Sequence, residues 1–464
     1  MNDYLEVLNP ATGDLIERIK IHKDSEIIEK IRLGHDAFKQ WANLDAYKRF
    51  GLLNKWSGLI KENKVEIAKV MTLESGKPLS ESLNEVDYAA SYIDWYAEEG
   101  KRVYGRSIPS SSVSKKAIVS KEPLGLVGAI TPWNFPAAMM TRKAAPALAA
   151  GCTFIVKPAG ETPITTIKLV KLAHQAGIPK TAVQFVIGSG KLIGDLFTNS
   201  KLIRKITFTG STSVGKELIK QSATNVQHVS MELGGHAPFI IARDADLDFA
   251  VKQLILSKFR NSGQTCICAN RILVHEDIAD SFTEKLKKAV TELQVGNGLE
   301  EDVQVGPVIN RKSYEKIKFQ IEDAVSKGAK VVIGNKYNVN TEKDTYFVYP
   351  TILANVTDKM DIMQEETFGP VAPIAIFKNN CEAVAIANST PFGLAAYFFT
   401  NDYRTGMYFH DQLKFGIIGW NDGSPSAAYA PFGGLKESGL GREGGLEGIE
   451  MYLETKYLSI GNLS

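Results

Sequence analysis

The sequence predicts an α/β protein with a doubly wound parallel sheet, a second α/β region and a small β element. Two observations carry this prediction. From Leu126 onward short apolar runs alternate with amphipathic stretches, and a second such series begins near Gly234. The chain has 464 residues, 44% of them hydrophobic, which is enough for two or three domains with separate cores. The ligand site of a doubly wound sheet lies beyond the carboxyl ends of its strands.

The first hundred residues read as helices, and Ser25 is the predicted N-cap of the first. Five apolar runs then predict strands, at 127–130, 154–156, 183–187, 205–208 and 229–231. After the second run, Thr162 is a predicted N-cap, Pro163 a first helical residue and Gly177 a helix end.

The second series predicts strands at 239–241, 272–274, 331–333 and 375–377. Alternating apolar residues at Ala117 and Val119, and again between 452 and 458, predict edge strands that pair between subunits. We therefore expect a homo-oligomer, a dimer or a tetramer.

Charge and cysteine content exclude several classes of protein. The 54 basic and 52 acidic residues give a net charge of +2 without a long block of one sign, which argues against a nucleic-acid or membrane-surface role. Four scattered cysteines are too few for a disulfide framework, and no Cys/His spacing predicts a metal site. The longest uncharged apolar run, Ala144 to Val156, has 13 residues, too few to span a bilayer. The amino terminus has no signal-peptide pattern, so we expect a cytoplasmic protein.

Three residues at predicted strand ends or loops are candidates for chemistry. Cys266 stands in a glycine-containing polar stretch and is either an accessible nucleophile or a buried small hydrophobe. Glu232 ends an apolar run before two glycines and is either a general base or a capping or ion-paired carboxylate. Asn134 stands on a proline-braced turn, where its amide either donates to an oxyanion or only shapes the turn.

The stretch from Phe208 to Lys216 is a candidate phosphate site, because it follows a predicted strand and opens a helix. It matches neither the Walker loop nor the G-x-G-x-x-G fingerprint. The amides after Gly210 and the Ser211 hydroxyl would face a pyrophosphate, and Lys157 would reach a ribose hydroxyl or its phosphate.

Seven motifs in one order make the chain resemble the aldehyde dehydrogenase superfamily. They are Trp133-Asn134, Lys157-Pro158-Ala159, Gly210-Ser211-Thr212, Glu232 to Gly235, Gly263 to Cys266, Glu365 to Pro370 and Pro431 to Gly434. The resemblance spans nearly the whole chain. It implies an aldehyde dehydrogenase-like fold, with a cofactor domain (1–104 and 124–234), a catalytic domain (235–436) and an oligomerisation element (105–123 and 437–464).

The resemblance also implies site roles. Cys266 is the expected nucleophile, Asn134 and the Cys266 amide stabilise the oxyanion, and Glu232 activates water. The nicotinamide then receives a hydride. The cofactor contacts implied are Thr131, Trp133, Lys157, Gly210, Ser211, Glu366 and Phe368.

Within the superfamily the match narrows to the succinate-semialdehyde dehydrogenase subfamily. Arg142, Arg260 and Ser426 coincide with its carboxylate clamp, and Phe135 and Phe432 would form apolar walls. Paired guanidinium groups select an aldehyde with a distal carboxylate. Glutarate semialdehyde or another ω-oxo acid is the alternative substrate. A non-catalytic relative and a cofactor-free, thioesterase-like hydrolase are alternatives of other classes.

Two further positions bear on cofactor choice and regulation. Many NAD-using members have Glu where this chain has Gly160, so we expect NADP to be accepted and preferred, with NAD also used. The neighbouring Glu161 would favour NAD if it replaced the missing carboxylate. Cys268 forms a Cys-x-Cys pair with Cys266 that resembles a redox switch; the alternative is a spectator thiol.

Overall fold

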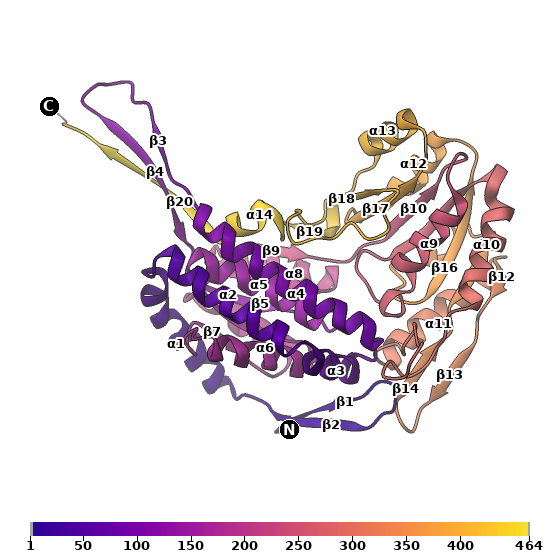
Figure 1. Cartoon of the computed structure of the whole chain (residues 1–464), viewed down its shortest axis with the longest axis horizontal. Helices are drawn as coiled ribbons and strands as arrows, with labels where there is room; N and C mark the ends of the chain where they lie inside the picture. The colour runs from indigo at the N-terminus through magenta and orange to yellow at the C-terminus, as the bar shows by residue number, and fades with distance from the viewer. Residues whose placement is uncertain (1–2, 463–464) are drawn as a thin grey trace.

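Two sheets, each with helices on both faces, make up most of the structure, a computed structural model that describes residues 3–462. The amino-terminal region and the carboxyl-terminal α/β region lie side by side, and a narrow arm projects from the first (Figure 1). The predicted α/β architecture is confirmed.

The first sheet has the order β19-β9-β8-β5-β6-β7, parallel except for β19. All five predicted strands of this series are present. Their order reverses between β5 and β8, so the ligand crevice of the sheet is expected beyond the ends of these two strands. The strands are β5 (Leu126–Ile130), β6 (Thr153–Lys157), β7 (Val183–Phe185), β8 (Ile203–Thr209), β9 (His228–Glu232) and β19 (Gly439–Leu440).

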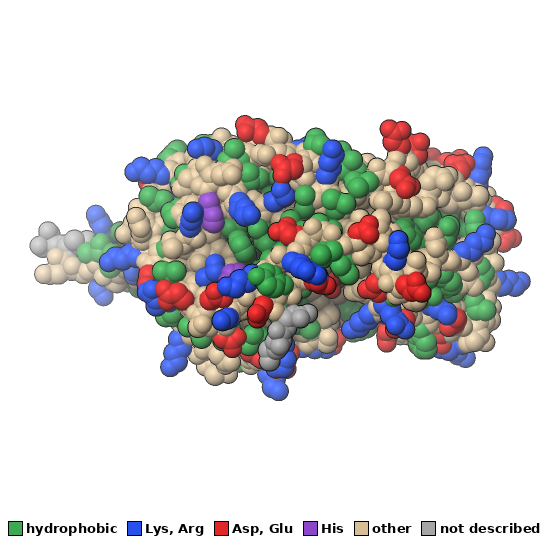
Figure 2. Space-filling view, turned by 90° about the horizontal axis from the view of Figure 1, so that it is seen from below, with side chains coloured by type: hydrophobic (Ala, Val, Ile, Leu, Met, Phe, Trp, Pro, Cys, Tyr) green, Lys and Arg blue, Asp and Glu red, His purple; other side chains and the backbone are tan. Residues whose placement is uncertain are grey.

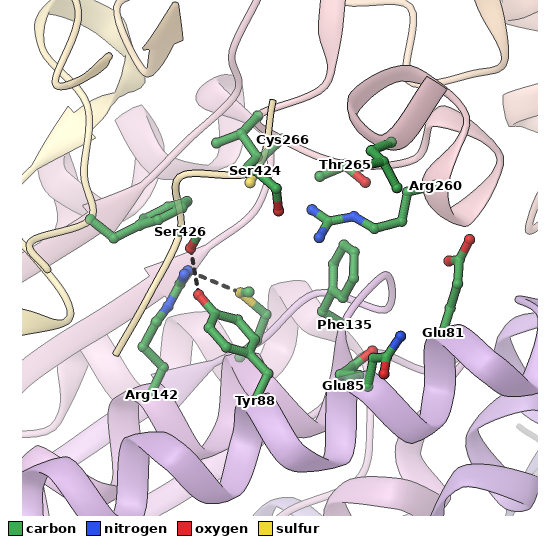
Figure 3. Close-up of a pocket in the computed structure, with 15 residues that line it drawn as sticks. Glu81, Glu85, Tyr88, Phe135, Arg142, Arg260, Thr265, Cys266, Ser424 and Ser426 are labelled. Carbon is green, nitrogen blue, oxygen red and sulfur yellow. Dashed lines mark hydrogen bonds between the residues drawn. The ribbon is translucent and has the colours of Figure 1, made fainter. Parts of the chain in front are cut away.

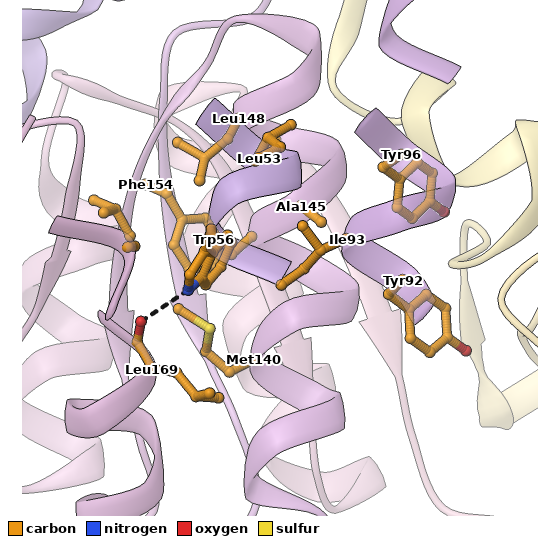
Figure 4. Packing of buried hydrophobic residues seen from close by; sticks show 14 of the residues in the cluster. Leu53, Trp56, Tyr92, Ile93, Tyr96, Met140, Ala145, Leu148, Phe154 and Leu169 are labelled. Atoms are coloured by element: carbon orange, nitrogen blue, oxygen red, sulfur yellow. Dashed lines mark hydrogen bonds between the residues drawn. The ribbon is translucent and has the colours of Figure 1, made fainter. Parts of the chain in front are cut away.

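Helices cover both faces of this sheet. One core packs α2 (Ala46–Glu62), α3 (Lys64–Ser75), α4 (Leu79–Glu99), α5 (Pro136–Ala150) and α6 (Pro163–Gln175) against the strands. The other core includes side chains of α1 (Asp24–Ala42), α7 (Gly190–Asn199) and α8 (Thr212–Ser222). Figure 4 shows the centre of the first core, where Trp56 is fully buried and its indole N–H donates to the Leu169 carbonyl at 3.0 Å. This packing holds α4 and α5 together beside the site described below.

The second sheet has the order β12-β15-β16-β11-β10-β17-β18 and is parallel except for β12. The four predicted strands are present, together with three that the sequence did not reveal. Helices α9 (Leu247–Lys258) and α10 (Ala279–Thr291) cover one face, and α11 (Arg311–Ser326), α12 (Asn380–Asn388) and α13 (Tyr403–Gln412) cover the other. The strands are β10 (Ala237–Ile241), β11 (Ala269–His275), β12 (Lys330–Ile333), β15 (Thr351–Ala354), β16 (Val371–Phe377), β17 (Ala395–Phe399) and β18 (Ile417–Trp420). A hairpin of β13 (Tyr337–Asn340) and β14 (Thr345–Val348) lies outside it.

The arm is an antiparallel sheet of β3 (Arg106–Ile108), β4 (Lys116–Pro123) and β20 (Leu453–Ile460), in the order β20-β4-β3. It extends away from the body at the left of Figure 1 and Figure 2, and most side chains of β20 are exposed. The predicted edge strands are therefore present, while their pairing between subunits stays a prediction. Before the arm, β19 joins the first sheet and α14 (Gly445–Glu450) contacts α5.

Three local predictions need correction. The chain begins with a hairpin of β1 (Tyr4–Leu8) and β2 (Leu15–Lys20) instead of a helix. Helix α1 starts at Asp24, not after Ser25, because the Glu26 carboxylate accepts the Lys23 N–H at 2.7 Å and fixes the helix start earlier. Thr162 is the N-cap residue of α6 and Pro163 its first residue, as predicted, but the Thr162 hydroxyl donates to the Trp133 carbonyl and makes no capping hydrogen bond within residues 3–462. Among residues 3–462, no helix combines the length and apolarity needed to cross a membrane.

Candidate active site

A cavity of about 360 Å³ is lined by residues from both α/β regions. It contains Cys266 and all five residues predicted to contact substrate: Phe135, Arg142, Arg260, Ser426 and Phe432. Figure 3 shows the two arginines extending into the cavity from different elements, with Cys266 above them. The sequence reasoning missed its other lining residues: Glu81, Asn84, Glu85, Tyr88, Met139, Leu256, Thr265, Ile267 and Ser424.

Cys266 stands on the loop between the short 3-10 turn η3 (Arg260–Gly263) and β11. Asn261, Ser262 and Gly263 have φ of 50°, 56° and 74°, so three successive residues adopt the left-handed conformation. Such strain persists only where surrounding contacts fix the backbone, and it is common at functional sites. Burial raises the pKa of the Cys266 thiol to about 12, while Arg142 and Arg260 act to lower it. The thiol therefore needs a base, or stronger positive charge, to become a nucleophile.

Asn134 lies next to the nucleophile loop. Its side-chain Nδ2 donates to the Gln264 carbonyl at 3.0 Å, two residues before Cys266. Its own carbonyl accepts from Lys77 Nζ at 2.6 Å and from Asn261 Nδ2 at 3.0 Å. The amide predicted to face an oxyanion is thus held beside the sulfur-bearing loop.

Glu232 ends β9 with both carboxyl oxygens buried, and within the described part of the chain neither has a hydrogen-bond partner. A Cβ placed on Gly433 would lie 3.0 Å from its Oε1, so the group abuts the loop that carries Phe432. Desolvation, and then the charge of Glu443, raise the pKa of Glu232 well above its usual value. A buried carboxyl without partners, beside a thiol-containing cavity, has the properties of a general acid or base.

A buried charge cluster that the sequence reasoning missed adjoins Glu232. Arg142 Nε lies 2.5 Å from Glu443 Oε2, and Lys143 binds the other oxygen of Glu443. Lys143 also donates to the Thr209 hydroxyl at 2.6 Å, at the end of β8. Arg142 and Lys143 are adjacent cations in the otherwise mostly apolar sequence of α5. They were the sequence signal for this cluster, because buried cations require a buried anion.

The two arginines of the predicted clamp differ in their surroundings. Arg142 is 1% exposed, pairs with Glu443 and lies 4.1 Å from the centroid of the Phe432 ring. Arg260 lies over the Phe135 ring at 5.3 Å, and in residues 3–462 it forms no ion pair. Ser426 Oγ shares a 2.5 Å hydrogen bond with Tyr88 Oη. Guanidinium and hydroxyl groups around an apolar cavity fit an organic anion.

Helix termini beside the first sheet point to a phosphate site at α8. Glu85 accepts two N–H groups at the start of α5, and Glu74 accepts two at the start of α6. Helix α8 has no such acid, and its N-cap Ser211 makes no capping hydrogen bond. Within residues 3–462 no side chain caps this helix start, and its N–H groups stand at the reversal of strand order, where a pyrophosphate binds in doubly wound folds.

The packing around α8 also fits a dinucleotide. A Cβ on Gly215 would lie 2.3 Å from Leu233, so this glycine allows α8 to approach the sheet closely. A Cβ on Gly234 would lie 3.3 Å from both Glu366 Oε2 and Thr212 Oγ1, which brings Glu366 beside the start of α8.

The remaining predicted cofactor contacts surround the same crevice. Gly210 precedes α8, Lys157 ends β6, and Thr131 follows β5 with a buried hydroxyl that has no partner among the described residues. The rings of Trp133 and Phe368 meet edge to face at 5.6 Å. The structure thus gathers the predicted cofactor residues around the ends of β5, β6 and β8.

Cys268 does not line the cavity that contains Cys266. It is fully buried, and its sulfur accepts from Lys258 Nζ at 3.3 Å. Cys266 and Cys268 are both free thiols. A redox role for Cys268 stays a prediction.

Sequence and structure comparisons agree on the family. The aldehyde dehydrogenase family model matches residues 1–458. Glutarate-semialdehyde dehydrogenase of Pseudomonas putida is 49% identical over 456 residues, 98% of this chain and 94% of that protein. Succinate-semialdehyde dehydrogenase (NADP+) of Escherichia coli is 48% identical over 459 residues, 99% of this chain and 95% of that protein. A solved structure described as an NADP-dependent enzyme of Escherichia coli superposes with a TM-score of 0.97 at 47% identity, covering 99% and 95% of the two chains. The chain belongs to the aldehyde dehydrogenase family.

Proposed function

We propose that this protein oxidises succinate semialdehyde to succinate with reduction of NADP or NAD. The observation that carries the proposal is the cavity that joins the Cys266 thiol to Arg142, Arg260 and Ser426. The two relatives described above act, by their names, on four- and five-carbon semialdehydes that end in a carboxylate. Two guanidinium groups facing a thiol match a substrate with an aldehyde at one end and an anion at the other.

The site residues have distinct proposed roles in this reaction. The Cys266 thiolate adds to the aldehyde carbon, and Asn134 Nδ2 with the Cys266 N–H donates to the oxygen that becomes negative. The nicotinamide of the bound cofactor supplies the hydride acceptor. Glu232 then takes a proton from water, which attacks the Cys266 thioester and releases the carboxylate product and the thiol.

The cofactor crevice fits a dinucleotide, with the pyrophosphate at the start of α8 and the nicotinamide ribose at Glu366. NADP is the proposed preferred form. A Cβ on Gly160 would meet only Leu5, at 3.7 Å or beyond, so a side chain there has room. Glycine therefore leaves no carboxylate that would repel a 2′-phosphate, and Lys157 is available to pair with it.

Glutarate semialdehyde is the second candidate substrate, because one relative carries that name and one methylene changes binding by only about 1–3 kcal/mol. Cys266 lines the cavity, Asn134 binds the loop that carries it, and Glu232 abuts the loop that carries Phe432. This intact set argues against a non-catalytic relative. The dinucleotide crevice argues against a cofactor-free hydrolase.

We also propose the domain division inferred from the sequence, except that 437–452 goes with the cofactor domain, because β19 joins the first sheet and α14 contacts α5. The arm is the proposed element that joins subunits of a homo-oligomer. The exposed edge strands β3 and β20 support that role. The cytoplasmic location stays a prediction from the sequence.

The decisive experiment is a panel of kcat/KM values for aldehydes of three to six carbons, with and without a terminal carboxylate, measured with each cofactor. The proposal expects the highest value for the four-carbon semialdehyde with NADP. A maximum at the five-carbon acid would favour glutarate semialdehyde. Equal values for charged and uncharged aldehydes would contradict the carboxylate clamp, and a hundredfold preference for NAD would contradict the cofactor proposal.

A further inference from the structure

A buried ion pair lies directly beneath Asn134. Lys77, just before α4, places its Nζ 2.6 Å from Glu85 Oε2, and the two side chains are 0% and 1% exposed. The same Nζ donates to the Asn134 carbonyl at 2.6 Å and lies 4.2 Å from the centroid of the Phe135 ring. One ammonium group therefore contacts two successive residues of the loop between β5 and α5.

The other oxygen of Glu85 holds the next segment of that loop. Glu85 Oε1 accepts from the N–H groups of Ala137 at 2.9 Å and Ala138 at 3.2 Å, in the first turn of α5. Lys77 thus binds Asn134 itself, while Glu85 fixes the helix that begins two residues later. Figure 3 shows Glu85 reaching from α4 toward Phe135.

The nucleophile loop is tied to the same point. Asn261 Nδ2 donates to the Asn134 carbonyl at 3.0 Å and to the Gln264 carbonyl at 3.2 Å. The Asn261 N–H in turn donates to Glu81 Oε2 at 2.8 Å, four residues before Glu85 on the same helix. One turn of α4 consequently supports both the Asn134 loop and the loop that carries Cys266.

Stability alone is a poor explanation for this arrangement. Removing two charges from water costs much of what their attraction returns, so well-packed apolar residues often replace a buried pair without loss. What the pair uniquely provides is a fixed geometry, because each of its bonds ends on the Asn134 loop or on the start of α5.

We propose that Lys77 and Glu85 are positioning residues that hold the Asn134 amide where it donates to the oxyanion formed on the aldehyde. The inference rests on the proposed function, specifically on the proposed role of Asn134. A misplacement of about 1 Å slows a chemical step by about a hundredfold. Asn261 keeps one of the two anchors on the Asn134 carbonyl, so loss of the pair slows hemithioacetal and thioester formation by about 10- to 100-fold.

The test is a double-mutant cycle on the holoenzyme. The paired variant K77M/E85Q removes both charges, and the amide oxygen that replaces the Glu85 carboxylate still accepts from Ala137 and Ala138. It is compared with wild type, N134A and the triple variant. We measure the rate at which reduced nicotinamide forms in the first turnover, at saturating aldehyde and NADP. The KM for aldehyde and the Kd for NADP are measured as well.

The proposal expects K77M/E85Q to slow the first turnover by about 10- to 100-fold, with KM and Kd changed less than about threefold. In the N134A background the same change has an effect below about twofold, because the pair acts through Asn134. Glu74→Gln is the matched control, since Glu74 is an equally buried helix cap, on α6, without a bond to Asn134. It keeps the first-turnover rate within about twofold. If K77M/E85Q does not fold, Lys77→Met alone, which removes the ammonium group bound to the Asn134 carbonyl, must show the same pattern.

Three results overturn the inference. A first-turnover rate in K77M/E85Q equal to wild type means that the pair does not position the amide. Equal slowing in the wild-type and N134A backgrounds means that the pair acts elsewhere. An unchanged first-turnover rate in N134A means that Asn134 does not stabilise the oxyanion. This result contradicts the proposed role of Asn134, whereas the first two results contradict only the positioning role of Lys77 and Glu85.

Discussion

Replacing Arg260 tests the carboxylate clamp most directly, because this guanidinium has no ion pair within residues 3–462 and lines the cavity that contains Cys266. A charge-assisted hydrogen bond contributes about 1.5–3 kcal/mol. A two-point contact is then worth about 2–4 kcal/mol, since part of the gain is offset by the desolvation of both charges. Because 1.36 kcal/mol corresponds to a tenfold change in rate, we expect Arg260→Gln to lower kcat/KM for succinate semialdehyde by roughly 30- to 900-fold.

The assay compares succinate semialdehyde with butanal, which has the same carbon chain and no carboxylate. Butanal should lose less than about threefold, because its contacts with Phe135 and Phe432 do not involve the charge. Arg243→Gln is the charge-matched control, since Arg243 is an exposed residue paired with Asp277. Equal losses for the two aldehydes in Arg260→Gln would refute the clamp. Arg142→Gln should lose stability as well, by about 3–5 kcal/mol, because it removes one of the two cations paired with buried Glu443.

Three other variants test the remaining roles. Glu232→Gln should give one burst of reduced cofactor and then almost no turnover, because the carboxylate that activates water is gone; an unchanged steady-state rate would contradict that role. Gly160→Glu should shift the kcat/KM ratio toward NAD by about tenfold or more, through repulsion of the 2′-phosphate, and a constant ratio would place the phosphate elsewhere. Burial raises the pKa of Glu74 from 4.5 to about 7. The Glu74 contribution to stability therefore falls by up to about 3 kcal/mol as pH rises from about 4.5 to 7, because the unfolded state releases the proton first. Burial also raises the pKa of Glu81 and Glu366 to about 7, so Glu74→Gln makes the fall smaller without abolishing it. Urea unfolding of both proteins at pH 5 and pH 8 measures the difference, and equal falls in the two would contradict the Glu74 contribution.

The first sheet could be predicted in detail because its strands are apolar runs separated by amphipathic helices. Two of the missed features escaped prediction for different physical reasons. Strand β17 is buried at all five residues, so it lacks the two-residue alternation of a half-buried strand and resembles part of a buried helix. The β1–β2 hairpin is mostly exposed and two-stranded, which leaves little apolar periodicity to detect.

Some site residues have a local signal in the sequence, and others are brought together only by the fold. Cys266, Glu232 and Asn134 occupy short motifs, so their neighbours in sequence identified them. Tyr88 and Ser426 are 338 residues apart and meet only in the folded chain. Their hydrogen bond is therefore invisible in either local stretch.

The arginines link substrate choice to the reactivity of the thiol. In the described state Arg142 and Arg260 act to lower the pKa of Cys266, against the larger effect of burial. In the proposed complex, a substrate carboxylate between the two arginines neutralises part of their charge, so we expect substrate binding to raise the pKa of the Cys266 thiol. The negative charge that develops on the aldehyde oxygen must then be stabilised by groups that the carboxylate does not neutralise. In the proposed mechanism the uncharged amide of Asn134 and the N–H of Cys266 meet that requirement, because a bound carboxylate does not cancel their donor capacity.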